Sequence, residues 1–199
     1  MIYRKFSLKK HNTFGLDYRA ECFISLKSED EFIRYIEEIH NFSSPLLILG
    51  GGSNILFTED FRGTILHPEN EDIKIEDRTN DYVIVSAGAG TNWDRFVEWC
   101  VDNDLGGLEN LSLIPGNTGA VPVQNIGAYG VEAKDALQQV KAFSLHNGLE
   151  RSFSNEECRF GYRDSIFKNK EKGKYLITRV FFKLTINHLY SLSYGSLEE

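Results

Sequence analysis

One segment of the chain combines cations and an aromatic hydroxyl in a spacing that suits an anionic ligand. It reads Arg159-Phe160-Gly161-Tyr162-Arg163-Asp164-Ser165, with two guanidinium groups and a phenol around one glycine. Arginine stays charged at every working pH and offers a planar fork of donors to an oxyanion. The carboxylate of Asp164 leaves a second interpretation open, in which Arg163 forms a structural salt bridge.

A run of three glycines forms a second candidate site. Gly50-Gly51-Gly52-Ser53-Asn54 lies between the apolar runs 46–49 and 55–57. Successive glycines let backbone N–H groups approach a ligand closely and form a concave nest for an anion, usually a phosphate. The alternative is a tight connection between two strands, which needs fewer than three glycines. We therefore interpret residues 50–54 as a phosphate-binding loop.

Residues 106–130 lack regular apolar spacing and are rich in glycine and proline. They include Ile114-Pro115-Gly116 and Gln124-Asn125-Ile126-Gly127-Ala128. The small residues clear space beside the backbone, and the two amides offer donors and acceptors, which suits a flat heterocycle such as a flavin or a base. Long irregular loops in compact domains are usually functional. The alternative is a loop that packs only on itself.

A third glycine motif, Gly88-Ala89-Gly90-Thr91-Asn92-Trp93, partly imitates the dinucleotide fingerprint G-x-G-x-x-G. The last position of that fingerprint should be small, so that helix and strand pack closely. Here it is Trp93, and no parallel βαβ unit follows. We interpret the motif as an ordinary turn from a strand into a helix.

The elements that must position these segments follow from apolar spacing, caps and turn residues. Ser28 and Glu31 form a capping box for an amphipathic helix over 29–41, and Thr91 with Asp94 is expected to cap a second helix. Ser154 with Glu157 caps a short turn. Strands are expected at 46–49, 64–66, 82–87 and 175–185, with a hairpin around Asn147-Gly148. This order predicts an α+β fold with mixed sheets and flanking helices, in two lobes.

Composition narrows the function further. The chain has 199 residues and a net charge of −7, so a nucleic-acid partner is not expected. No apolar run is long enough for a membrane span, and the N-terminus does not resemble a signal peptide. Three scattered cysteines and five scattered histidines predict a reducing, cytoplasmic location and no metal site. No obligate protein partner is evident.

Together the motifs resemble the UDP-N-acetylenolpyruvoylglucosamine reductase family (MurB), over nearly the whole chain. The matching residues are Asn12-Thr13-Phe14-Gly15, the segments 47–54, 88–90, 107–110 and 114–116, the block Pro122 to Glu132, and the block Cys158 to Phe167. The last two blocks are the most specific. The resemblance implies an oxidoreductase of peptidoglycan synthesis that reduces the enolpyruvyl ether of UDP-N-acetylglucosamine to UDP-N-acetylmuramate. It also implies NADPH as co-substrate.

The resemblance implies non-covalent FAD in the two-lobed fold of p-cresol methylhydroxylase and vanillyl-alcohol oxidase. Residues 1–187 would form the FAD-binding domain, with lobes at about 1–67 and 68–187, and 188–199 would begin a substrate-binding domain. The implied cofactor-binding residues are Gly50, Gly51, Gly52, Ser53, Asn54, Ile114, Pro115, Gly116, Gln124, Asn125, Gly127, Ala128 and Ile177.

Arg163 matches the family's active-site arginine, which would stabilise an enolate, while Tyr162 and Tyr194 would contact the UDP-sugar with it. The family's catalytic Ser and Glu lie in a part that follows the matched segments. We therefore expect the given chain to bind FAD without full turnover. The alternatives are a non-catalytic FAD- or nucleotide-binding module, a flavin oxidase of the same fold, and a structural domain without a cofactor.

Overall fold

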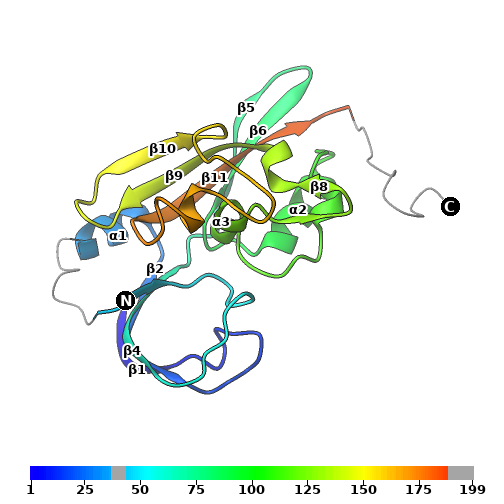
Figure 1. The fold of residues 1–199 in the computed structure, drawn as a ribbon. Helices are drawn as coiled ribbons and strands as arrows, with labels where there is room; N and C mark the ends of the chain where they lie inside the picture. Colours follow the sequence, from blue (N-terminus) through cyan, green and yellow to red (C-terminus); the bar gives the residue numbers. More distant parts are fainter. Residues whose placement is uncertain (37–43, 188–199) are drawn as a thin grey trace.

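The computed structural model describes residues 1–36 and 44–187, which form two main sheets with a helix at their junction, and one small two-stranded sheet (Figure 1). Two helices are long enough to cover a sheet, α1 (Glu29–Ile36) and α2 (Trp93–Asp102). The strands are β1 (Ile2–Ser7), β2 (Arg19–Leu26), β3 (Leu46–Ile48), β4 (Phe61–Pro68), β5 (Ile73–Arg78), β6 (Tyr82–Gly88), β7 (Gly127–Ala128), β8 (Val131–Glu132), β9 (Leu137–Ser144), β10 (Glu150–Ser154) and β11 (Tyr175–Thr185).

The first sheet has the strand order β1-β2-β4-β3 and mixes both orientations. β1 pairs with β2 antiparallel, while β4 pairs parallel with both β2 and β3. Buried residues of β2 and β4, such as Phe23 and Ile65, form a core with Leu8 and Leu49. β3 is an edge strand that leads directly into the glycine-rich loop 50–54.

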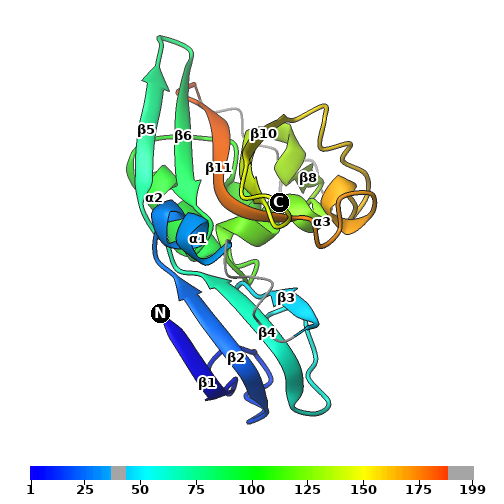
Figure 2. The same ribbon diagram turned by 90° about the vertical axis from the view of Figure 1, so that its left-hand side faces the viewer.

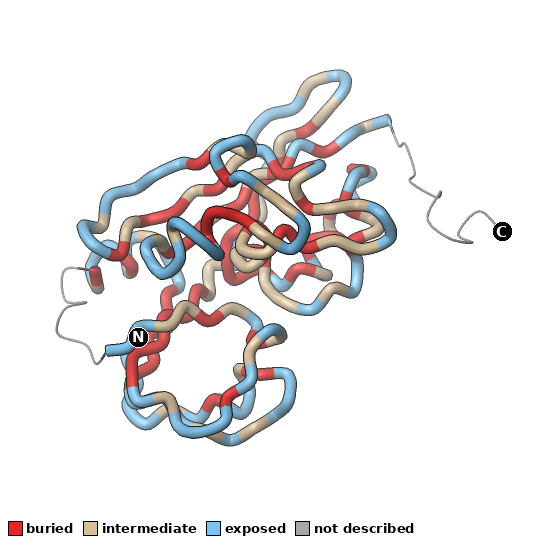
Figure 3. The backbone as a smooth tube through the Cα atoms, in the orientation of Figure 1, coloured by how far each residue is buried: buried red, intermediate tan, exposed pale blue. Residues whose placement is uncertain are grey.

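The second sheet has the order β10-β9-β11-β6-β5 and is antiparallel throughout. Its main core contains Trp93 and Phe96 of α2. Both rings lie against Phe182 of β11: its ring centroid is 5.7 Å from that of Trp93 and 5.1 Å from that of Phe96. Figure 3 shows buried backbone in both lobes, and exposed backbone at the tip of the β5–β6 hairpin. The α+β prediction is confirmed, and its mixed-sheet part describes the first sheet.

α1 lies at the junction of the two sheets (Figure 2). Its buried Phe32 and Ile36 pack in one cluster with residues of both sheets. That cluster contains Ile24 and Leu66 from the first sheet and Leu176 from β11 of the second. A continuous apolar cluster of this kind opposes separation of the lobes, because each exposed side chain would cost about 1.5–3 kcal/mol.

Most predicted elements are confirmed, with one correction at a helix cap. The first helix begins at Glu29, with the N–H of Glu31 donating to Ser28 Oγ at 3.2 Å, while its expected end at 41 lies outside the described residues. The expected cap of α2 by Thr91 is wrong. Its N-cap is Asn92, whose side chain accepts from the N–H of Arg95 at 3.1 Å. The Asp94 carboxylate instead accepts hydrogen bonds from Ser112 and Leu113.

Other differences concern strands. Residues 46–48 form β3 but are half-exposed or exposed, because one side of this edge strand faces a pocket. β1, β2 and β5 were not predicted; β1 and β5 carry several charged residues, whereas β2 ends in the mostly apolar run 22–26 that was overlooked. The hairpin β9–β10 and strand β11 were predicted.

Candidate functional site

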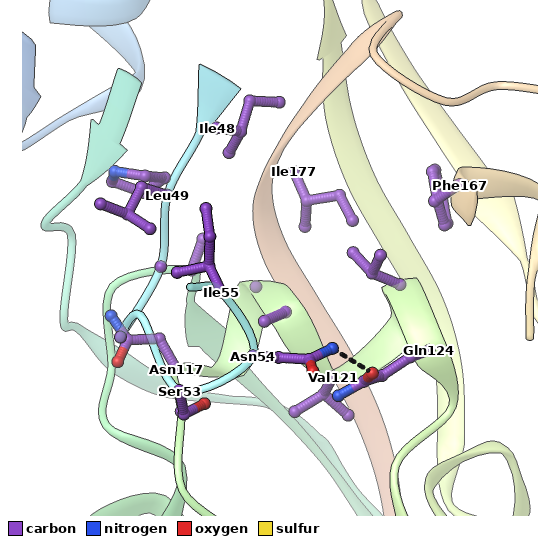
Figure 4. A pocket seen from close by; sticks show the side chains of 18 of the residues that line it. Ile48, Leu49, Ser53, Asn54, Ile55, Asn117, Val121, Gln124, Phe167 and Ile177 are labelled. Atoms are coloured by element: carbon purple, nitrogen blue, oxygen red, sulfur yellow. Dashed lines mark hydrogen bonds between the residues drawn. The ribbon is translucent and has the colours of Figure 1, made fainter. Parts of the chain in front are cut away.

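A pocket of about 500 Å³ lies between the two sheets (Figure 4). One wall comes from the first sheet, through β3 and the loop 50–54. The other comes from the second sheet, through Ile177 of β11, the segment 114–121 and Phe167. Most lining groups are aliphatic or glycine backbone. This composition and size are typical of sites for a cofactor with a flat apolar ring.

The glycine-rich loop is held by close backbone packing. Gly52 has φ of +68°, and a Cβ placed there would lie 2.0 Å from the carbonyl oxygen of His11. A Cβ on Gly51 would lie 3.1 Å from the Cα of Gly116. A Cβ on Gly50 would have no heavy atom nearer than 3.8 Å. Gly52 is therefore required by the loop itself, Gly51 is tightly packed, and a Cβ on Gly50 would make only ordinary van der Waals contacts at the pocket wall.

Two side-chain hydrogen bonds join the loop 50–54 to the other wall. Ser53 Oγ donates to the carbonyl of Pro115 at 2.9 Å, and Asn54 Nδ2 donates to Gln124 Oε1 at 2.8 Å (Figure 4). These bonds bring together two segments that lie more than 60 residues apart in the sequence. The two glycine-containing segments singled out in the sequence therefore meet at one site.

The segment 114–116 is positioned by α2. The carboxylate of Asp94 accepts from the N–H of Leu113 at 2.7 Å and from the hydroxyl of Ser112 at 2.8 Å. These bonds, the one from the Leu113 backbone first, lower the pKa of Asp94 below its usual value. Leu113 itself has φ of +61° and is exposed, so the carboxylate holds a strained turn just before the pocket wall.

The charged residues that line the described pocket come from the segment after Phe167: Lys168, Glu171 and Lys172. In a chain of net charge −7, this gives the pocket a local excess of one positive charge. Lys168 Nζ donates to the carbonyl of Arg163 at 2.9 Å and so connects the pocket to the arginine segment. Such a charge balance suits a ligand with an anionic part.

Of the cofactor-binding residues expected from the sequence, ten line this pocket: Gly50, Gly51, Gly52, Ser53, Asn54, Ile114, Pro115, Gly116, Gln124 and Ile177. Asn125, Gly127 and Ala128 do not. The Asn125 side chain is fully buried, donates to the carbonyl of Gly161 and accepts from the N–H of Lys134, each at 3.0 Å. Asn125 therefore joins loop segments inside the protein.

Arg163 and Tyr162 lie beside this pocket, outside its lining. Arg163 donates through Nη2 to the carbonyl of Gly127 at 2.6 Å, and its guanidinium lies 6.0 Å from the Tyr162 ring centroid. The Asp164 carboxylate accepts from Asn169 Nδ2 at 2.8 Å. Within the described part of the chain, Arg163 and Asp164 form no ion pair, which removes the salt-bridge interpretation. Tyr194 lies outside the described residues.

Arg163 is held in a strained conformation. It has φ of +53°, as do few non-glycine residues, and the nearby Asn125, Tyr129 and Arg159 also have positive φ. Tyr162 is 86% exposed. Strained backbone that presents an exposed aromatic ring and a guanidinium is typical of a site that contacts a further ligand.

Part of the pocket wall was not predicted from the sequence, notably Asn117, Val121, Phe167, Lys168 and Lys172. Asn117 and Val121 lie within the irregular region that was singled out, so their signal was present. Lys168 and Lys172 follow the arginine block in an ordinary charged stretch, which carries no signal of a ligand. Only the fold brings that stretch to the pocket.

No group of three or more His, Cys, Asp or Glu side chains is placed to hold a metal ion within residues 1–36 and 44–187. In the same part of the chain, no helix has the length and apolar character needed to cross a membrane.

The chain is similar in sequence to a known family and to known proteins. Residues 20–152 match the FAD binding domain family. The UDP-N-acetylenolpyruvoylglucosamine reductase of Flavobacterium johnsoniae is 45% identical over 98% of this chain, and the match covers 58% of that protein. The chain thus spans less than two thirds of this relative.

Solved structures agree on the fold. The UDP-N-acetylenolpyruvylglucosamine reductase (MurB) of Thermus caldophilus superposes with a TM-score of 0.74 at 26% identity, over 92% of this chain and 62% of that one. p-Cresol methylhydroxylase shares the fold with a TM-score of 0.56 at 15% identity, over 84% of this chain and 36% of that one. The expected two-lobed fold, with a glycine-lined pocket between its lobes, is confirmed. Because the family match spans residues 20–152, the chain belongs to the FAD binding domain family.

Proposed function

We propose that the pocket between the two sheets binds FAD non-covalently and that the chain is the FAD-binding part of a UDP-N-acetylenolpyruvoylglucosamine reductase. The observation that carries this proposal is the meeting of the loop 50–54 with Pro115 and Gln124 at one pocket. The similarity to the reductase of Flavobacterium johnsoniae supports it.

The residues present fit FAD. The absence of side chains at Gly50, Gly51 and Gly52, which line the pocket, would let the cofactor's pyrophosphate approach the backbone N–H groups of 50–54. Ile114 and Ile177 offer apolar surface to the ring system, and Lys168 and Lys172 offer positive charge. FAD would supply hydride transfer between NADPH and the substrate. Gly127 and Ala128 remain predicted cofactor contacts.

Arg163 and Tyr162 are proposed to bind the substrate, a UDP-sugar enolpyruvyl ether, together with Tyr194. A hydride added to the enolpyruvyl group leaves negative charge that spreads into its carboxylate. The Arg163 guanidinium, held by the carbonyl of Gly127, would stabilise that charge more in the transition state than in the ground state. The strained backbone at Arg163 fixes the cation before the substrate arrives.

The organisation of the chain is also part of the proposal. Residues 1–187 would be the FAD-binding domain, with lobes at about 1–67 and 68–187, and 188–199 the start of a substrate-binding domain. The protein would act in the cytoplasm, in the synthesis of peptidoglycan for the cell wall. We propose no nucleic-acid, membrane or obligate protein partner.

The test begins with the visible absorbance of the purified protein after incubation with FAD and removal of the excess. Bound flavin is expected, and anaerobic NADPH should bleach it. In the full-length reductase, UDP-N-acetylglucosamine enolpyruvate should then restore the colour, and more slowly in an Arg163→Ala variant. A protein that binds FAD and is never reduced by NADPH would favour the non-catalytic module, and one that retains no flavin would refute the proposal.

A further inference from the structure

Thr178 occupies the joint between the two sheets. Its carbonyl accepts from the N–H of Ala89 at 2.9 Å and from Asn70 Nδ2 at 2.7 Å. Its hydroxyl donates to Glu29 Oε1 at 2.9 Å. Asn70 belongs to the connection between β4 of the first sheet and β5 of the second, and Glu29 is the first residue of α1. Thr178 therefore contacts the turn after β6, the connection between β4 and β5, and the start of α1.

The carboxylate of Glu29 has another partner in the second sheet besides Thr178. Its Oε2 accepts from Lys141 Nζ of β9 at 2.8 Å, and the same ammonium pairs with Glu150 of β10 at 2.9 Å. The Glu29 and Lys141 side chains are 29% and 21% exposed, so solvent screens this pair less than a surface ion pair. Burial alone would lower the pKa of Lys141, but the bonds to both carboxylates raise it.

A bulge in β11 connects this contact to the pocket. The register between β11 and β9 shifts between Ile177 and Arg179, which leaves Thr178 as the extra residue. Regular alternation would put Ile177 and Val180 on opposite faces of the sheet. With the bulge, both belong to the same core cluster, and Ile177 lines the pocket while the Thr178 hydroxyl meets Glu29.

We propose that Glu29 is a positioning residue for the cofactor site: its bonds to Thr178 and Lys141 fasten α1 to the second sheet and set the distance between the loop 50–54 and Ile177. This inference rests on the proposed function. α1 packs on β2, the loop 50–54 follows β3 of that sheet, and Ile177 neighbours the residue that Glu29 holds.

The chain offers a matched control on the same helical turn. Glu31 Oε2 accepts from the N–H of Lys27 at 2.8 Å and therefore stabilises the start of α1. Glu29→Gln and Glu31→Gln remove the same charge from the same turn. Thr178→Val removes the hydroxyl, whereas Thr178→Ser keeps it.

The experiment measures the dissociation constant of FAD by calorimetry for each variant, together with the thermal midpoint of the protein without FAD. Glu29→Gln and Thr178→Val should weaken FAD binding about tenfold or more. Thr178→Ser and Glu31→Gln should stay close to the original protein, even where Glu31→Gln lowers the thermal midpoint. Unchanged affinity in Glu29→Gln and Thr178→Val, or an equal loss in Glu31→Gln, would overturn the proposal.

Amide hydrogen exchange at Ala89, measured without FAD, separates this inference from the proposed function. The Ala89 N–H donates to Thr178, so it should exchange faster in Glu29→Gln and not in Glu31→Gln. If the original protein bound no FAD, the proposed function would fail. Faster exchange in Glu29→Gln would still support the fastening contact, and unchanged exchange would overturn it.

Discussion

Asn54 and Gln124 share a 2.8 Å hydrogen bond, although 70 residues separate them and each lies in a different lobe. Asn54 ends the glycine-rich loop, and Gln124 ends the short helix α3 (Val121–Gln124). The bond closes one side of the pocket in which we propose that FAD binds. Asn54 is therefore a sensitive position for testing charge at the site.

Asn54→Asp is expected to weaken FAD binding about tenfold or more while the fold persists. The Gln124 amide can rotate and donate to the new carboxylate, so the link between the loops survives. The added negative charge would repel the pyrophosphate by about 1–4 kcal/mol at a separation near 4 Å. Titration calorimetry at low and high salt measures this effect, with Asn54→Ser as the uncharged control. An affinity that equals that of Asn54→Ser would contradict it.

Gly50→Val and Gly52→Ala should separate ligand binding from folding. A Cβ on Gly50 would make only ordinary van der Waals contacts, so valine should lower the thermal midpoint of the protein without FAD less than Gly52→Ala does, and should obstruct the cofactor. Gly52→Ala would force a Cβ against the His11 carbonyl at positive φ, and it should cost about 1–3 kcal/mol of stability. Thermal unfolding with and without FAD checks both. Full flavin retention by Gly50→Val would show that 50–54 is not the phosphate loop.

In the full-length reductase, Arg163→Ala should slow re-oxidation of the reduced flavin by the enolpyruvyl substrate about a hundredfold or more, and affect reduction by NADPH much less. The reason is that negative charge develops on the substrate in only one of the two half-reactions. Stopped-flow absorbance of each half-reaction measures this. Equal losses in both would identify Arg163 as a structural residue that serves the Gly127 carbonyl.

Stability should fall as the pH drops below about 6.5, in part because of His11. Burial chiefly lowers the pKa of His11, the nearby His67 lowers it further, and Glu69 opposes them. The folded state then binds fewer protons than the unfolded chain, so this contribution is present above the unfolded value and is lost as the pH falls through the lowered pKa. Thermal midpoints from pH 8 to 5 should change less steeply in His11→Phe. An identical slope would contradict this.

The three cysteines should resist thiol reagents in the native protein. Cys22, Cys100 and Cys158 are free and buried. Burial, with the neighbouring carboxylates, raises the pKa of Cys100 and of Cys158 to about 12, so almost no thiolate forms near neutral pH. Labelling with a chromogenic disulfide should be negligible until denaturant is added. Early reaction of one thiol would reveal a local opening around it.

The sequence by itself determined the elements whose signals are local. The hairpin β9–β10, the long strand β11 and the start of α1 follow from apolar spacing, a turn and a cap, and all three are present. The glycine-rich loop and the irregular region were also visible, because clustered glycine and proline leave few regular conformations. The resemblance to the reductase family came from the same segments.

Only the tertiary structure decided what those segments do together. It alone showed that Gly52 is required by His11, that Asn125 is used inside the protein, and that Lys168 reaches the pocket. It also placed the bulge at Thr178 that joins Glu29 to the pocket wall. The physical reason is that such contacts depend on backbone paths many residues apart. Local propensity and apolar spacing carry no information about which distant loops will meet.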